Sequence, residues 1–172
     1  LRRRIFDAHQ HWHGATFIDA CAGSGAMGFE AWSRGASEVI MVEADRKVFH
    51  TLKRNLTKME EGNKKILEDM GSISCANQPF EKWIGFFRET YSTWSEEQQI
   101  DCVIFFDPPY HLAALYKKVI IDEIRDKGWF KGSLWIESDE KEGLKSSFWD
   151  ENGFEAKKII TQRDSYVYVV EF

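Results

Sequence analysis

Short apolar runs alternate with longer amphipathic segments along most of this chain. Runs such as "TFIDA", "EVIMVE" and "IDCVIFF" have the length and composition of buried strands, and helical periodicity follows each of them. This alternation predicts a parallel α/β sheet, because parallel neighbours need a long crossover connection. We predict strands at residues 16–20, 38–43, 64–67, 100–106 and 133–138, and helices at residues 25–35, 45–59, 80–94 and 112–128.

The end of the chain follows a different pattern. "FEAKKIIT" and "SYVYVVEF", at residues 154–161 and 165–172, flank a short polar connection and predict a terminal hairpin. Such a hairpin adds an antiparallel strand near one end of the sheet. The chain has 172 residues, which suits one domain, and no apolar run approaches the roughly 20 residues of a membrane span. We therefore expect a single domain over residues 1–172 and no contact with a membrane.

Charge and cysteine content narrow the classes of function. The formal net charge of −5 gives no support for broad nucleic-acid binding, although "RRR" at residues 2–4 leaves room for a local basic patch. Three cysteines form an odd number and lack metal-type spacing, so they indicate buried thiols in a reducing cytosol. The histidines of "HQHWH" are two residues apart, a spacing that does not place them on one helix face. The sequence therefore predicts no metal site.

The glycine-rich turn "DACAGSGAMG" follows the first predicted strand. Its glycines fit G-x-G-x-x-G, a pattern that alone is weak support for a dinucleotide site. Glu43 ends the second strand, near the spacing at which a carboxylate binds ribose hydroxyls. Asp19 would repel a pyrophosphate and suits a ligand with a cationic amino-acid end, such as S-adenosylmethionine. The alternatives are a turn cap for Asp19 and an ordinary exposed strand end for Glu43.

The stretch "FFDPPY" ends the fourth predicted strand. Proline donates no backbone hydrogen bond and stops a central strand, and it pushes the residue before it toward extended geometry. Asp107 and Pro108 are therefore expected in a stiff, extended segment at a strand end. The alternative is a rigid loop stop without chemistry.

Taken together, "FIDACAGSGAMGFEAWSRGA", "VEAD", "FFDPPY" and "WIESD" resemble class I S-adenosylmethionine-dependent methyltransferases. More narrowly, they resemble the bacterial family that methylates a guanine N2 of 16S ribosomal RNA, and "RRRIFDAHQHW" resembles the N-terminal helix of that family, here residues 1–13. The resemblance runs from Arg2 to Phe172. It implies a Rossmann-like, mostly parallel seven-stranded sheet with an antiparallel C-terminal strand and helices on both faces.

This chain departs from the family pattern in three places. The family usually has a segment ahead of the N-terminal helix, whereas this sequence begins at the predicted helix, so we expect that segment to be missing from it. Arg3 stands where the family usually has Glu. The region of residues 78–99 is longer than is typical, and we interpret it as a helix that covers the core, with an RNA contact as the alternative.

The resemblance also implies roles for particular residues. Asp107 and the Pro108 carbonyl would accept the hydrogens of the target amine, Pro109 would fix that carbonyl, and Tyr110 would stack on the flipped base. Cofactor binding is expected from the glycine turn, from Glu43 and from an acidic residue after the third strand that meets the adenine amino group. The residues concerned are Asp19, Ala22, Gly23, Gly25, Glu43 and, with Met70 as the alternative, Asp69.

The implied partner is 16S ribosomal RNA or the small-subunit particle, bound by a cytoplasmic monomer. Alternatives are amino methylation of adenine N6 or of a glutamine amide, whose families more often carry N-P-P than D-P-P, and a non-catalytic RNA-binding module. An NAD-dependent oxidoreductase is disfavoured by Asp19. The basic residues that we consider for phosphate contacts are Arg2, Arg3, Arg4, Arg34, Lys157, Lys158 and Arg163.

Overall fold

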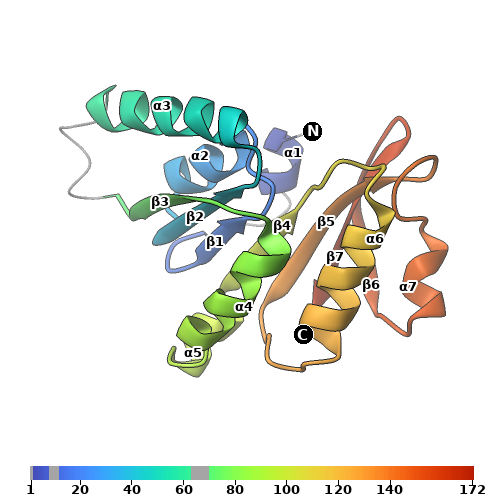
Figure 1. Ribbon diagram of the computed structural model, residues 1–172. Helices are drawn as coiled ribbons and strands as arrows, with labels where there is room; N and C mark the ends of the chain where they lie inside the picture. The colour runs from blue at the N-terminus through green and yellow to red at the C-terminus, as the bar shows by residue number, and fades with distance from the viewer. Residues whose placement is uncertain (1, 8–11, 63–69) are drawn as a thin grey trace.

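A seven-stranded sheet organises the protein (Figure 1). The computed structural model describes residues 2–7, 12–62 and 70–172. The strand order is β3-β2-β1-β4-β5-β7-β6; the pairs from β3 to β5 are parallel, and β7 runs antiparallel to β5 and β6. The predicted fold class is therefore confirmed. The strands are β1 (Thr16–Asp19), β2 (Glu38–Glu43), β3 (Ser72–Asn77), β4 (Cys102–Phe106), β5 (Ser133–Asp139), β6 (Ala156–Gln162) and β7 (Ser165–Glu171).

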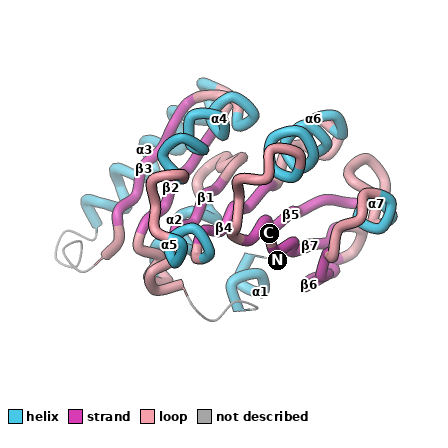
Figure 2. Tube along the Cα trace, turned by 90° about the horizontal axis from the view of Figure 1, so that it is seen from below, coloured by secondary structure: helices cyan, strands magenta, loops and turns pink. Residues whose placement is uncertain are grey.

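Helices cover both faces of this sheet (Figure 2). One face carries α1, α2 and α3, and the other carries α4, α6 and the π-helical turns that continue α6. In the described part of the chain, no helix is long and apolar enough to cross a membrane. The helices are α1 (Arg2–Asp7), α2 (Ala26–Ser33), α3 (Arg46–Gly62), α4 (Phe80–Tyr91), α5 (Glu96–Ile100), α6 (Ala113–Lys117), the π-helix η2 (Lys118–Arg125) and α7 (Ser147–Glu151).

The central strands are buried on both faces, as parallel strands between helix layers usually are. In β4, Val103 and Phe105 pack on the layer of α1 to α3, whereas Ile104 and Phe106 pack on the layer of α4 and α6. All five residues of β4 are buried. The near-continuous apolar run in the sequence therefore reflects a strand without a solvent face.

The order of the strands reverses between β1 and β4, which are parallel neighbours. Ligands of open α/β sheets bind outside the carboxyl ends of the strands at such a switch point. Asp19 pairs in register with Phe105, and the Ala20 amide donates to the Phe105 carbonyl at 2.9 Å. The glycine turn and the segment Asp107–Tyr110 are thereby brought side by side.

The third strand differs from its prediction. The sheet uses Ser72–Asn77 beside β2, whereas residues 64–67, where we predicted a strand, lie outside the described residues. β3 is an edge strand rich in serine, so its apolar alternation is weak in the sequence. The carboxyl end of β3, which points to the switch point, is therefore Asn77.

Several predicted boundaries also shift. The N-terminal helix predicted over residues 1–13 ends at Asp7 in its described part, and His13 instead forms an isolated bridge with Ala36. The helix predicted over residues 112–128 becomes α6 followed by the π-helical turns. The long segment 78–99 forms α4 and most of α5, and α4 buries four aromatic or aliphatic side chains in the core, as expected for a covering helix. Of the cysteines, Cys102 is buried, and the other two are half-buried.

Replacing either of two glycines with alanine should change the free energy of unfolding, in opposite directions. A Cβ at Gly132, immediately before β5, would overlap the carbonyl oxygen of Cys102, whereas a Cβ at Gly85 in α4 would meet no atom within 4 Å. We expect Gly132→Ala to lower the free energy of unfolding by about 1–3 kcal/mol and Gly85→Ala to raise it by about 0.5–1 kcal/mol. Urea denaturation measures both, and a Gly132→Ala variant as stable as the wild type would contradict this packing.

Candidate active site

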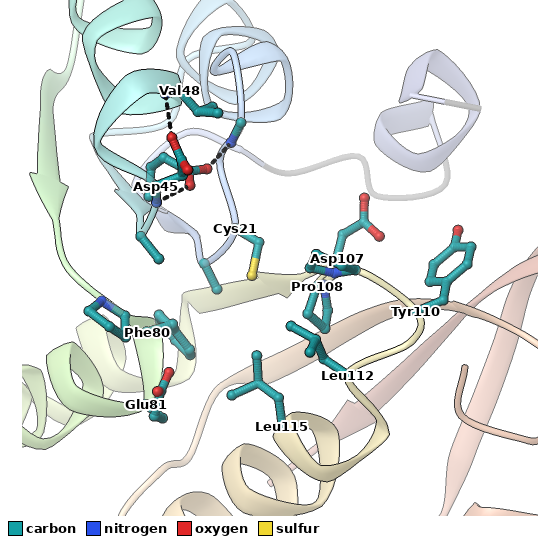
Figure 3. A pocket seen from close by; sticks show the side chains of 16 residues that line it. Cys21, Asp45, Val48, Phe80, Glu81, Asp107, Pro108, Tyr110, Leu112 and Leu115 are labelled. Atoms are coloured by element: carbon teal, nitrogen blue, oxygen red, sulfur yellow. Dashed lines mark hydrogen bonds between the residues drawn. The ribbon is translucent and has the colours of Figure 1, made fainter. Parts of the chain in front are cut away.

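A pocket of about 680 Å³ opens at the carboxyl ends of the strands (Figure 3). Its volume lies in the range of pockets that hold small molecules and cofactors. It is lined from the glycine turn, the ends of β2 and β4, and the starts of α3, α4 and α6. Figure 3 shows Asp45 and Val48 on one side of the pocket and Asp107 and Tyr110 on the other.

The lining of this pocket is acidic. Glu43, Asp45, Glu81 and Asp107 all contribute to it. No lysine, arginine or histidine is among the described residues that line it. Such a cleft favours a cationic ligand and disfavours a pyrophosphate, because fixed charges of one sign set the local potential.

The glycine turn is shaped by two glycines with different roles. Gly23 has φ +54°, and a Cβ placed on it would meet no atom within 4 Å. Gly25, at φ +89°, is the N-cap of α2, and a Cβ placed on it would lie 2.6 Å from side-chain atoms of both Leu52 and Phe29. Gly23 therefore leaves open space on the pocket side, whereas Gly25 allows close packing of α2 and α3.

Glu43 ties the turn to the start of α3. Its Oε2 accepts from the Gly23 amide at 2.8 Å, and its Oε1 accepts from the Asp45 amide at 2.8 Å. Asp45 in turn caps α3, because its Oδ1 accepts from the amides of Lys47 and Val48. These two amide bonds lower the pKa of Asp45. Glu43 is therefore a fixed acceptor at the pocket wall rather than a loose strand end.

Asp19 lies beneath the turn and is only 2% exposed. Its Oδ2 accepts from the Gly28 amide in the first turn of α2 at 3.0 Å, as in the turn-cap alternative. It is not among the residues that line the pocket. Burial raises the pKa of Asp19 from 3.8 to about 7, partly offset by the Gly28 amide, and Glu43 raises it further. Asp19 is thus a buried carboxylate whose charge acts on the pocket through the turn.

Asp107 lies on the side of the pocket opposite Asp45 (Figure 3). It follows β4 directly and lines the pocket, and its carboxylate makes no hydrogen bond or ion pair with another described residue. Burial, together with the nearby charges of Glu137 and Asp19, holds the pKa of Asp107 well above its usual range. An unpaired carboxylate in such a place can accept hydrogen bonds, and finally a proton, from a bound amine.

Glu137 is a second buried carboxylate on this side, and our sequence reasoning gave it no role. It lies at the carboxyl end of β5, one residue beyond the pairing of Phe106 with Ile136, and is 9% exposed. The Tyr110 hydroxyl lies 3.4 Å from Glu137 Oε1 and 3.3 Å from the Ser165 hydroxyl. Burial raises the pKa of Glu137 as well. The acidic end of "WIESD", next in register to "FFDPPY", was the signal that marked this residue.

The Pro108 carbonyl is also held in place. The buried Tyr116 hydroxyl donates to the Glu137 carbonyl at 2.9 Å and lies 3.4 Å from the Pro108 carbonyl. A carbonyl oxygen has two lone pairs, so this contact leaves Pro108 able to accept from a ligand. Tyr116 thus connects β5 with the segment that follows β4.

The structure brings together most of the residues that the sequence indicated. Gly23 and Glu43 line the pocket with the whole segment Asp107–Tyr110. Ala22 shapes the turn from behind, because its amide donates to Val42 and its carbonyl accepts from Gly25. Asp69 lies outside the described residues. Among the described residues, no group of three or more His, Cys, Asp or Glu side chains could hold a metal ion.

Curated relatives match most of the chain. A protein from Buchnera aphidicola, named ribosomal RNA small subunit methyltransferase D, is 29% identical over 98% of this chain and 78% of its own length. A protein of the same name from Escherichia coli is 27% identical over 76% of this chain, and the match spans 56% of the length of that relative.

Solved structures share the fold at lower identity. A provisionally assigned methyltransferase from Escherichia coli superposes with a TM-score of 0.67 at 22% identity, over 99% of this chain and 85% of its own. A provisionally assigned methylase from Haemophilus influenzae gives 0.66 at 22% identity, over 99% of this chain and 96% of its own. The sequence model of the family described as "Conserved hypothetical protein 95" matches residues 1–159. The chain therefore belongs to this family and has the class I methyltransferase fold.

Proposed function

We propose that this protein transfers a methyl group from S-adenosylmethionine to the exocyclic N2 amine of a guanine in 16S ribosomal RNA. The observation that carries the proposal is the acidic pocket, which has a glycine turn at one end and the unpaired carboxylate of Asp107 at the other. The relatives named small subunit ribosomal RNA methyltransferases support the RNA substrate. The assignment of guanine N2 as the methylated atom is based on the resemblance of "FFDPPY" and its neighbours to the guanine-methylating family. Cytoplasmic location and a monomeric state stay predictions.

The residues at the turn fit S-adenosylmethionine. The open space over Gly23 admits the ligand, and the Glu43 carboxylate is fixed where ribose hydroxyls can donate to it. The acidic lining and the buried charge of Asp19 suit the ammonium and sulfonium groups. Asp69 stays a predicted contact of the adenine amino group. When bound, S-adenosylmethionine supplies an already activated methyl group, so the protein has to position the acceptor.

The side of the pocket with Asp107 and Pro108 can compensate for the low nucleophilicity of a guanine amine. The lone pair of this nitrogen is delocalised into the ring, so the free amine is a poor nucleophile. Asp107 and the Pro108 carbonyl accept its two hydrogens, which fixes the amine and directs its lone pair toward the methyl group. As the N–C bond formed and the methyl–sulfur bond of the donor broke, leaving S-adenosylhomocysteine, one N–H proton would pass to the ionised Asp107, because a raised pKa makes this carboxylate a stronger base than an ordinary aspartate. The Tyr110 ring offers a surface on which the base stacks.

The product identifies the reaction directly. We would digest ribosomal RNA from a strain that lacks the protein and from the complemented strain, and analyse the nucleosides by mass spectrometry. N2-methylguanosine that depends on the protein supports the proposal. N6-methyladenosine in its place would assign the adenine alternative, and no change in any ribosomal nucleoside would overturn both.

Gly23 tests the cofactor site with a matched control. Gly153 also has a positive φ, +71°, and open space at its Cβ, but it lies between α7 and β6, outside the pocket lining. Alanine at either position costs about 1–2 kcal/mol of backbone strain. Only Gly23→Ala should weaken S-adenosylhomocysteine binding, by about tenfold or more, and Gly23→Val should abolish it. Isothermal titration measures this, and tighter binding of NAD to the wild type would contradict the cofactor assignment.

Asp19 gives a pH test. Its pKa of about 7 in the folded state exceeds the 3.8 of an ordinary Asp, so between these values the folded protein holds a proton that the unfolded chain has released. This contribution to stability is complete below about pH 4 and is lost as the pH rises through 7. Asp19→Asn keeps an acceptor for the Gly28 amide without a charge. Its free energy of unfolding, relative to wild type, should therefore rise between pH 4 and pH 8.

Urea denaturation without cofactor at a series of pH values measures this difference, and a difference independent of pH would show that Asp19 is not a buried, raised-pKa carboxylate. The same variant should bind S-adenosylmethionine more weakly at pH 8, because the charge that attracts the ammonium is gone. Unchanged affinity would assign Asp19 to the turn cap alone.

Asp107 tests the acceptor side. Asp107→Ala should nearly eliminate methyl transfer and leave cofactor affinity almost unchanged, because Asp107 addresses the amine and not the cofactor. Asp107→Asn keeps an oxygen acceptor and should retain part of the rate. Tyr110→Ala should lose about 1–3 kcal/mol of stacking, and Tyr110→Phe should be mild, since the hydroxyl contacts are long. The measurement is single-turnover transfer of labelled methyl groups to small-subunit particles; a fully active Asp107→Ala would make "FFDPPY" a mere strand stop.

A further inference from the structure

The exposed face of α3 is basic up to its last turn, where Glu60 and Glu61 follow. Between residues 46 and 58 the helix carries five lysines and arginines and no aspartate or glutamate. Leu52 and Leu56 face the core and are 0% and 8% exposed, whereas all five basic side chains are exposed. We call these five residues the basic face of α3; they are Arg46, Lys47, Lys53, Arg54 and Lys58.

These charges do not serve the helix itself. Helices gain stability from acidic residues in the first turn and basic residues in the last, and α3 has neither. Its first turn instead contains Arg46 and Lys47. Arg54 and Lys58 are four residues apart, a spacing at which like charges repel. Since the arrangement costs helix stability, it indicates a ligand outside the helix.

The five basic side chains are not paired with acidic residues of the described chain either. None of the five forms a salt bridge with an acidic residue of the described chain. Two of the candidates from the sequence differ in this respect: Arg34 is engaged by Asp7 and Glu30, and Lys158 lies over two tyrosine rings. The basic face is thus a region of the described chain where five positive charges on one helix stay available to a partner.

The charge is also segregated within the molecule. The whole chain has a formal charge of −5 and the segment 46–58 has +5, so the remainder carries −10. The basic face starts at the site, because Asp45 and Val48, at the beginning of α3, line the pocket (Figure 3). From there it extends for about 18 Å along the helix, at 1.5 Å per residue. That length can follow several successive phosphates of a nucleic-acid strand.

We propose that the basic face of α3 binds the phosphate backbone of the ribosomal RNA that presents its base to the pocket. The proposal rests on the proposed function, since it adds the RNA-positioning surface to the same site. Lysine and arginine contacts to phosphate fix register and orientation, and they make affinity depend on salt. An acidic protein needs such a local surface, because the rest of its charge repels RNA.

The test removes three of the charges at the end of the face that is distant from the pocket. The variant Lys53→Gln, Arg54→Gln, Lys58→Gln replaces exposed residues with a good helix former and relieves a repulsion, so its free energy of unfolding should not fall. The matched control removes the same charge from other exposed positions, with Lys117→Gln, Lys118→Gln, Lys145→Gln. Direct binding of a labelled 16S ribosomal RNA transcript is measured over a range of salt concentrations, without methyl transfer.

In the α3 variant we expect affinity for the transcript to fall at least tenfold near 0.1 M salt, and the slope of log affinity against log salt to shrink by about 2. The RNA concentration for half-maximal single-turnover transfer should rise by the same factor, while the rate at saturating RNA and the affinity for S-adenosylhomocysteine stay at wild-type values. The control should match the wild type.

Two results overturn the inference: wild-type affinity and salt slope in the α3 variant, or an equal loss in the control. Failure of the proposed function has a different signature, namely a wild-type protein that transfers no methyl group to ribosomal RNA or particles. Because RNA binding and methyl transfer are measured separately, the two failures are distinguished.

Discussion

The parallel pairing of β1 with β4 is the constraint on which the rest of the site depends. Asp19 lies in register with Phe105, and the Ala20 amide is bonded to the Phe105 carbonyl. From this pairing the two strands leave the sheet together, one into the glycine turn and the other into the prolines of "DPPY". The two turns that carry chemistry are far apart in the sequence, yet the order of strands makes them neighbours at this edge.

Several carboxyl groups crowd this edge at a cost to the fold. Burial raises the pKa values of Asp19, Asp107 and Glu137, so the charged form of each carboxyl group is less stable here than it would be in water. A protein selected for stability alone would place apolar or amide side chains there, and strained or costly groups that persist are typically functional. These three groups lie at the carboxyl ends of β1, β4 and β5, around one pocket, which is consistent with groups kept to attract a cation and to accept a proton.

Much of this could be predicted from the sequence, for reasons that differ between elements. The buried central strands are unmistakable because both of their faces are apolar, as in β4. The edge strand Ser72–Asn77 was missed because it contains two serines, one large apolar residue and a terminal Asn, and "KKIL" nearby matched a strand better. The roles of Glu137 and of the basic face of α3 could not be predicted, because both depend on tertiary placement. Glu137 becomes notable only because the neighbouring strand places Asp107 beside it. A charged helix face is ordinary unless, as here, its charges have no ion-pair partners among the described residues.

The two charged regions together restrict how a nucleotide can approach. A phosphate inside the pocket would meet the carboxylates of Glu43 and Asp107 and no basic side chain in the described lining. The uncharged base is therefore the part of an RNA strand that the pocket tolerates, and the backbone has to stay outside, where α3 offers positive charge. A base that enters while its phosphates remain at the rim must be unpaired or turned out of its helix. Charge thus selects an exposed, unstacked nucleotide before any hydrogen bond to Asp107 reads the identity of the base.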